Sequence, residues 1–171
     1  MNKPLFTNEY IGNAGVKYVF KYYDSDNFDH LPKDRIKQSY AVAFYKDKFL
    51  VVNNIKNPKQ QYGLIGGSVE EGEDPNETLI REIMEESRMK VLEYKLIGYQ
   101  KVIDTRGIQN DFYQLRYFAR VEPDGFFISD PAGCVTEIIE CTKDDYKKYF
   151  DWGEIGDYII KRAYEIKQPS A

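Results

Sequence analysis

The segment from Gly67 to Met89 constrains the fold of this chain more than any other. It holds eight acidic and two basic residues, so its net charge is −6, whereas the whole 171-residue chain carries −4. Asp74 is a good helix N-cap, Pro75 suits the first helical position, and Glu77 stands where a capping box needs its acceptor. These signals predict a helix that starts after Asp74 and ends at about Ser87.

Helical periodicity divides this segment into an acidic and an apolar face. At about 100° per residue, Glu82, Glu85 and Glu86 fall on one side. The opposite side holds Ile80 and Ile83, so it should pack on a sheet. Like charges three and four residues apart repel one another. The acidic face is therefore either a solvated surface or a site for hard divalent cations, which prefer oxygen ligands. The periodicity alone leaves both interpretations open.

The flanking regions indicate strands. The glycine cluster from Gly63 to Gly72 indicates irregular, tightly turned backbone. Strands before and after a central helix, with a second helix at the end, predict an α+β fold, a sandwich around a mixed β-sheet. The expected strands are Val16–Tyr23, Tyr40–Tyr45, Phe49–Val52, Val91–Ile103, Asp111–Val121 and Val135–Cys141, and the expected last helix is Glu154–Ile166.

Length and composition exclude several classes of protein. A chain of 20.1 kDa suits one domain, with residues 1–38 as an N-terminal strand and loop extension and 39–167 as the core. It has no apolar run of roughly 20 residues and no apolar N-terminal leader, so we expect no membrane association. Two cysteines are too few for a disulfide framework, which favours a cytoplasmic setting. The net negative charge argues against binding of duplex nucleic acid.

The acidic helix and its lead-in resemble the Nudix box, Gly-x5-Glu-x7-Arg-Glu-aliphatic-x-Glu-Glu-x-Gly-aliphatic. Seven of its nine specified positions match outright, and Met89 is a conservative fit to the last. Arg88 stands where the family has glycine, and Ile65 replaces the usual proline of the lead-in. The similarity covers about Ser39 to Lys167 and implies a Nudix-type α/β/α sandwich. The matching residues are Gly67, Glu73, Arg81, Glu82, Ile83, Glu85 and Glu86.

The resemblance implies a MutT-like hydrolase that uses Mg²⁺, or Mn²⁺, to cleave a small nucleotide substrate containing a diphosphate. It implies that Glu82, Glu85 and Glu86 are the metal-side carboxylates, with the carbonyl of Gly67 as a further ligand. Glu82 would take the proton of the attacking water. The resemblance also implies that Glu85 and Arg81 complete the set of catalytic residues.

Arg81 has two interpretations that the sequence leaves open. It either forms an ion pair with Glu73 that ties the loop to the helix, or it forms an ordinary helix pair four residues away. Family members often supply one more carboxylate from a later strand or loop. Glu137 is our candidate metal ligand for that role, with Glu122 and Asp111 as rivals, and an exposed strand carboxylate is the alternative for each.

Other features leave alternatives for geometry and function. A family glycine at position 88 would end the helix with a positive φ, and arginine there costs about 1 kcal/mol unless the helix ends in another way. The alternative functions are a non-hydrolytic nucleotide-binding sensor or interaction module, and an isomerase, for which Cys134 and Cys141 lie too late in the chain. His30 is expected to be polar surface. Substrate identity does not follow, and a homodimer is possible.

Overall fold

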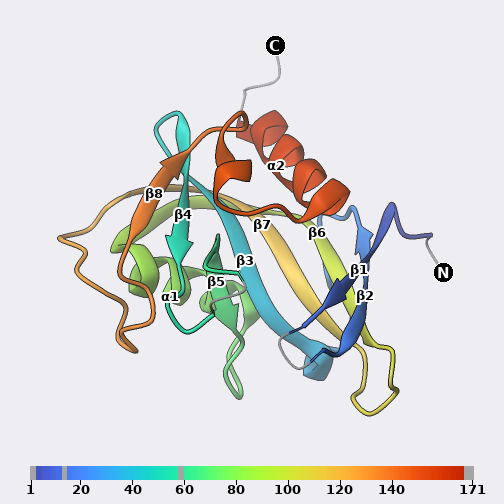
Figure 1. Cartoon of the computed structure of the whole chain (residues 1–171). Helices are drawn as coiled ribbons and strands as arrows, with labels where there is room; N and C mark the ends of the chain where they lie inside the picture. Colours follow the sequence, from blue (N-terminus) through green and yellow to red (C-terminus); the bar gives the residue numbers. More distant parts are fainter. Residues whose placement is uncertain (1–2, 13–14, 58–59, 168–171) are drawn as a thin grey trace.

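The computed structural model describes residues 3–12, 15–57 and 60–167. Parts of the predicted N-terminal extension, and the last four residues of the chain, lie outside the described residues. Within these ranges, eight strands form one curved mixed sheet, with two α-helices packed against it (Figure 1). The elements in chain order are β1 (Phe6–Ile11), β2 (Lys17–Tyr23), η1 (Lys33–Arg35), β3 (Ile36–Tyr45), β4 (Lys48–Asn53), β5 (Tyr62–Ser68), α1 (Pro75–Ser87), β6 (Met89–Asp104), β7 (Phe112–Pro123), β8 (Ile138–Cys141), η2 (Tyr146–Lys148) and α2 (Gly153–Lys167).

The strand order is β1-β2-β6-β7-β3-β5-β4-β8. Strands β3 and β7 pair in parallel and the other pairings are antiparallel. Successive side chains of a strand point to opposite faces of the sheet. In β3, Ala41 and Ala43 accordingly join the core under α1, whereas Val42 and Phe44 join the core under α2. The structure confirms the predicted α+β sandwich around a mixed sheet.

Helix α1 starts as the sequence predicts. The Asp74 carboxylate accepts the Asn76 amide at 2.8 Å, and Glu77 accepts the Asp74 amide at 3.3 Å, which completes the capping box. Leu79 and Ile83 are fully buried on its sheet side. At the other end Arg88 adopts the left-handed conformation, with φ 54° and ψ 37°, and its amide donates to Met84. The helix thus ends in the conformation that a glycine adopts without strain.

Some strand predictions were wrong, each for a physical reason. The glycine-rich stretch is not irregular throughout, because Tyr62–Ser68 forms β5 between β3 and β4. The last strand begins at Ile138 instead of Val135, because side-chain oxygens take the preceding amides. Asp130 accepts the amide of Val135 at 2.8 Å, and Asn53 accepts the amide of Glu137 at 2.9 Å.

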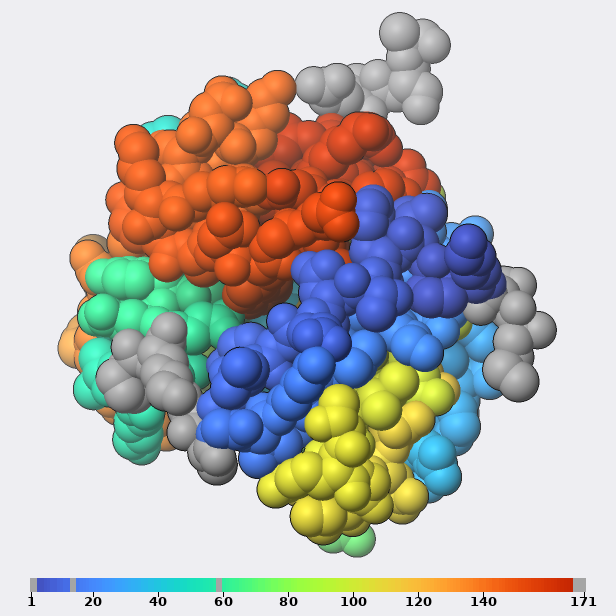
Figure 2. All heavy atoms as spheres, turned by 45° about the vertical axis from the view of Figure 1, so that its right-hand side comes forward, coloured from blue at the N-terminus to red at the C-terminus, as the bar shows by residue number. Residues whose placement is uncertain are grey.

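The N-terminal strands form the edge of the sheet, and β1 was not predicted. They lie against the C-terminal part of the chain, as the space-filling view shows (Figure 2). The rings of Phe6 and Tyr158 are 5.3 Å apart, and the Asn8 side chain donates to the Trp152 carbonyl. These contacts hold β1 over the start of α2.

Candidate active site

Two glycines near the end of β5 allow a close approach, Gly66 by strand β3 and Gly67 by helix α1. A Cβ added at Gly66, whose φ is +149°, would lie 2.6 Å from the Tyr40 Cα. A Cβ added at Gly67 would lie 2.6 Å from the carboxyl carbon of Glu82. The Gly66 amide donates to Glu86 Oε2 at 3.0 Å. The missing side chain of Gly67 and the amide of Gly66 therefore bring two of the predicted metal-side glutamates, Glu82 and Glu86, against β5.

Arg81 connects the loop before α1 to the acidic face of the helix. Its Nε and Nη2 donate to the two oxygens of Glu73 at 2.8 and 3.0 Å, and Nη2 also donates to the Ser68 carbonyl at 3.1 Å. Its Nη1 donates to Glu82 at 2.9 Å and to Glu85 at 3.3 Å. The two-point pair with Glu73 and the helix pair with Glu85 exist together, so the two alternatives for Arg81 do not exclude one another.

Burial and neighbouring charges shift the pKa values of the glutamates on this surface. Hydrogen bonds from Arg81 hold the pKa of Glu73 at about 2. Burial raises the pKa of Glu82, against the opposing effect of Arg81. Burial, followed by the charges of Glu82 and Asp130, raises the pKa of Glu86 to about 8, although the Gly66 amide lowers it. Ionising Glu82 and Glu86 together is therefore unfavourable without a cation nearby.

The donor set fits a hard divalent cation, because it consists of carboxylate oxygens beside two glycines that carry no side chain. No group of three or more His, Cys, Asp or Glu side chains within residues 3–12, 15–57 and 60–167 is arranged to hold a metal as it stands. The hydrogen bonds explain this, since Arg81 holds Glu82 and Glu85 while Glu86 turns to Gly66. Mg²⁺ keeps several waters and needs few direct protein ligands, so a complete protein cage is not required.

The predicted additional carboxylates lie in different surroundings. Glu137 is exposed just before β8 and accepts the Tyr62 hydroxyl at 2.8 Å. Glu122 lies 3.8 Å from the Lys90 ammonium, and Asp111 lies 2.7 Å from that of Lys101.

Asp130, which was not among the predicted additional carboxylates, is the later carboxylate whose charge acts on Glu86. It lies in the loop between β7 and β8 and accepts the amides of Cys134 and Val135. An aspartate directly before a proline, as here before Pro131, is typical of a turn. No neighbouring residue in the sequence indicates that its charge acts on a glutamate of α1.

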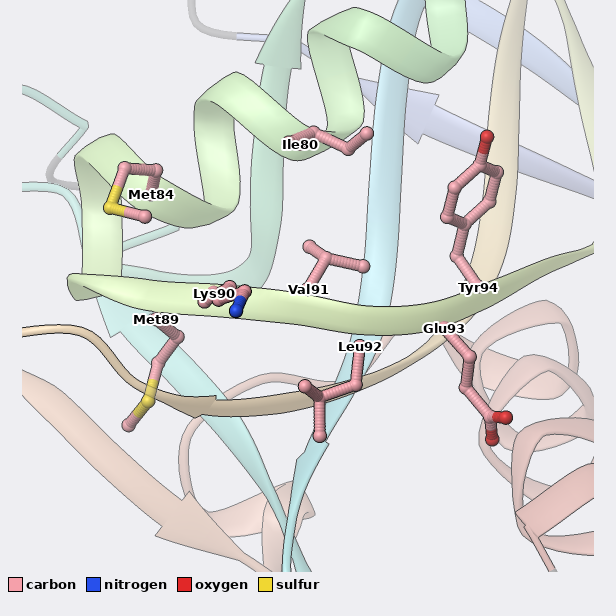
Figure 3. Close-up of a pocket in the computed structure, with 8 residues that line it drawn as sticks. All are labelled: Ile80, Met84, Met89, Lys90, Val91, Leu92, Glu93 and Tyr94. Carbon is pink, nitrogen blue, oxygen red and sulfur yellow. The ribbon is translucent and has the colours of Figure 1, made fainter.

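A surface groove of about 550 Å³ lies on another side of α1 (Figure 3). Ile80 and Met84 of α1 and Val91 of β6 line it, and Leu92 and Glu93 extend from the far side of the strand. The lining residues include none of the motif glutamates, so the groove is separate from the candidate active site. Its lining is Ile80, Met84, Met89, Lys90, Val91, Leu92, Glu93 and Tyr94.

The sequence offered three further candidates, one histidine and two cysteines. His30 is exposed, with its Nε2 3.1 Å from the Tyr99 hydroxyl. Cys141 is fully buried and Cys134 is partly buried, and both thiols are free. In the described part of the chain, no helix is both long and apolar enough to cross a bilayer.

Comparison with known proteins defines the class to which this arrangement belongs. A family model described as NUDIX domain matches residues 36–161, which include β5, α1 and the acidic cluster. The chain belongs to the NUDIX family of hydrolases, which act on phosphoric anhydride bonds and generally use divalent metal ions.

Solved structures share the fold. The Bacillus subtilis pyrophosphohydrolase BsRppH, solved as a point mutant, is 18% identical with a TM-score of 0.67, over 93% of this chain and 97% of that one. A NUDIX hydrolase from Nitrosomonas europaea is 17% identical with a TM-score of 0.62, over 78% and 91%. A MutT NUDIX hydrolase from Burkholderia pseudomallei is 16% identical with a TM-score of 0.57, over 73% and 95%. No curated protein sequence matches the chain.

Proposed function

We propose that this protein is a Mg²⁺-dependent pyrophosphohydrolase that cleaves a nucleoside triphosphate, or another nucleoside diphosphate derivative, by attack of water on phosphorus. The observation that carries the proposal is the approach of Glu82 and Glu86 to the bare backbone of Gly66 and Gly67. Two carboxylates whose pKa values are raised there favour a bound cation. Mn²⁺ has the same ligand preference and is the expected substitute.

Each residue of the cluster has a proposed role. Glu82, Glu85 and Glu86, with the carbonyl of Gly67, would hold the cation. When bound, it would neutralise the diphosphate and lower the pKa of a water. Glu82 is the proposed general base, because burial raises its pKa and so makes it a better proton acceptor than a solvated glutamate.

In the proposed reaction the oxygen of water bonds to phosphorus, the phosphoric anhydride P–O bond breaks, and the water proton passes to Glu82. Arg81 acts by positioning, since it holds Glu82 and Glu85 through Nη1 and is itself held by Glu73. Glu137 remains a proposed further ligand. The charge of Asp130 on Glu86 makes Asp130 the better-placed candidate for the same role.

A hydrolysis assay tests this proposal. The wild type is incubated with nucleoside triphosphates and nucleoside diphosphate derivatives in Mg²⁺ or in EDTA, and phosphate-containing products are separated. Glu85→Gln should lower turnover by at least about 100-fold, as expected for loss of a catalytic carboxylate. Glu140→Gln, which changes an exposed carboxylate of β8 that pairs with Lys48, is the matched control and should retain full activity.

Nucleotide binding without turnover by the wild type would instead support a non-hydrolytic sensor or interaction module. Mg²⁺-independent turnover, or full activity of Glu85→Gln, would contradict the proposed roles. Calorimetric titration with Mg²⁺ and Mn²⁺, with and without nucleotide, measures cation binding independently of turnover.

A further inference from the structure

Two large apolar side chains project into solvent from the loop between β7 and β8. Phe126 is 97% exposed and Ile128 is 84% exposed, whereas Phe127 between them packs against the core under α1. Within residues 3–12, 15–57 and 60–167, no other large apolar side chain is as exposed as Phe126. Apolar side chains of this size, exposed together in one place, are typical of a surface that contacts another molecule.

The loop that carries these side chains is held at both ends. The Asp124 amide donates to the Arg88 carbonyl at 2.8 Å, and the Asp130 carboxylate accepts the Val135 amide at 2.8 Å. The buried ring of Phe127 holds the middle of the loop. Apolar groups presented by a fixed backbone lose less entropy on binding than groups on a loose segment.

The groove beside α1 is an open apolar depression of about 550 Å³. Its volume lies in the range of pockets that hold ligands larger than one aromatic side chain. Ile80, Leu92 and Tyr94 line it and are about half-exposed. Figure 3 shows Met84 and Met89 at one end of the groove. Methionine side chains adapt their shape to an inserted apolar group.

The projecting loop adjoins the methionine end of the groove. Met89 pairs with Pro123 across β6 and β7. Phe126 follows Pro123 by three residues, so their Cα atoms are at most about 11 Å apart. The exposure of Phe126 shows that it lies outside the groove of its own chain. Two copies related by a twofold axis can each place this loop on the groove of the other, which gives a closed dimer.

Charge also favours a second copy over other occupants. Residues 122–130 include three acidic residues and no basic residue. Lys90 and Glu93 are the charged residues of the groove, and Arg120 lies 3.0 Å from Glu93 and neutralises it. The acidic loop of one copy would therefore meet the exposed ammonium of Lys90 on the other, and such complementarity favours association. The same loop would repel an anionic lipid surface.

We propose that this protein forms a twofold dimer in which Phe126 and Ile128 of each copy enter the groove of the other copy. The groove and the loop then bury each other's exposed apolar surface. This inference does not depend on the proposed hydrolysis, because neither the loop tip nor the groove contains a motif glutamate.

Sedimentation velocity and light scattering over a range of protein concentrations test the inference. The wild type should reach a mass of twice 20.1 kDa. Phe126→Ser should raise the dimer Kd at least about 100-fold, because each dimer loses two buried phenylalanine side chains. Ile80→Glu, which places a carboxylate in the groove, should do the same. Ile108→Ser, at an apolar position 72% exposed in the turn between β6 and β7, is the matched control and should keep the wild-type Kd.

Mixing two variants tests the reciprocal contact. Phe126→Ser and Ile80→Glu should each be monomeric alone, but a mixed pair retains one intact contact, between the phenylalanine of one chain and the groove of the other. The mixture should therefore form heterodimers at concentrations where neither variant forms homodimers. The variants should keep the wild-type Tm, since their side chains are exposed.

A wild type that stays monomeric at the highest concentration would overturn the inference, as would a dimer that survives Phe126→Ser or Ile80→Glu. A mixture that stays monomeric, or open polymers in place of a dimer, would contradict the twofold arrangement. Binding of the monomer to vesicles of anionic lipid through Phe126 would instead identify a membrane as the occupant of this surface. Hydrolysis is assayed separately, so its absence would leave a measured dimer in place.

Discussion

Replacing Glu86 with glutamine should stabilise the metal-free protein at alkaline pH. The native pKa of Glu86 is about 8, first because of burial and then because of the charges of Glu82, Asp130 and Glu85. Glutamine keeps an oxygen that can accept the Gly66 amide, which Glu86 Oε2 now accepts at 3.0 Å. The substitution therefore removes the charge and preserves the hydrogen bond.

The direction of the pH effect follows from the difference between the pKa of Glu86 in the unfolded chain and its pKa in the folded protein. In the unfolded chain Glu86 ionises near its ordinary pKa of 4.5, whereas in the folded protein it ionises near 8. Between these values the folded state binds more protons, so the wild type loses stability as pH rises through this window. At about 1.36 kcal/mol for each pH unit, the upper limit is roughly 5 kcal/mol. Partial hydration lowers the expected gain of Glu86→Gln to about 2 kcal/mol at pH 9, against almost none at pH 4.

Urea unfolding in EDTA at pH 4, 7 and 9 measures this difference. Glu122→Gln is the control and should stay within about 0.5 kcal/mol of the wild type at every pH. Added Mg²⁺ should then stabilise the wild type more than Glu86→Gln, because binding to the folded state alone raises its stability. A difference between Glu86→Gln and wild type that is the same at pH 4 and pH 9 would refute the electrostatic description of the site.

Three further substitutions test other parts of the site. Arg88→Gly should raise the free energy of unfolding by about 0.5 kcal/mol in urea, since relief of the left-handed strain exceeds the entropy cost of glycine; a loss would contradict this. Glu73→Gln should cost up to about 3 kcal/mol at pH 7, and the loss should shrink as pH falls from 4.5 towards 2, because Arg81 lowers the native pKa of Glu73 to about 2. Gly66→Ala, whose Cβ would meet Tyr40, should cost at least about 2 kcal/mol in thermal unfolding, and a neutral result would show that β5 can move.

Helix α1 was predictable because its signals are local. The cap at Asp74, the proline after it and the reciprocal Glu77 lie within four residues, and each makes its contact inside the same turn. The periodicity of Leu79 and Ile83 then determines which side meets the sheet. The matched family pattern adds the position of the glutamates on that helix.

Strand β5 was not predictable from local signals, because its glycines serve contacts with distant residues. Glycine weakens a strand, so the cluster indicated turns. The strand forms because Gly66 faces Tyr40 of β3 and Gly67 faces Glu82 of α1, neither of which is near in sequence. Strand β1 was missed for a related reason, since its packing on α2 through Phe6 depends on a helix more than 140 residues later.

The same contrast between local signals and contacts of distant residues applies to the candidate site. The glutamates of α1 follow from their spacing, but the effect of the Asp130 charge on Glu86 depends on how distant segments meet. Arg116 and Arg120 occupy positions of the same parity on β7, so the pleat assigns both to one face and the sequence treats them alike. Arg120 lies half-exposed beside Glu93, whereas Arg116 is buried between Tyr40 and Trp152. What distinguishes the two arginines is the neighbouring strand and the start of α2, so a local motif predicts the proposed metal-side glutamates, whereas the burial of Arg116 depends on tertiary structure.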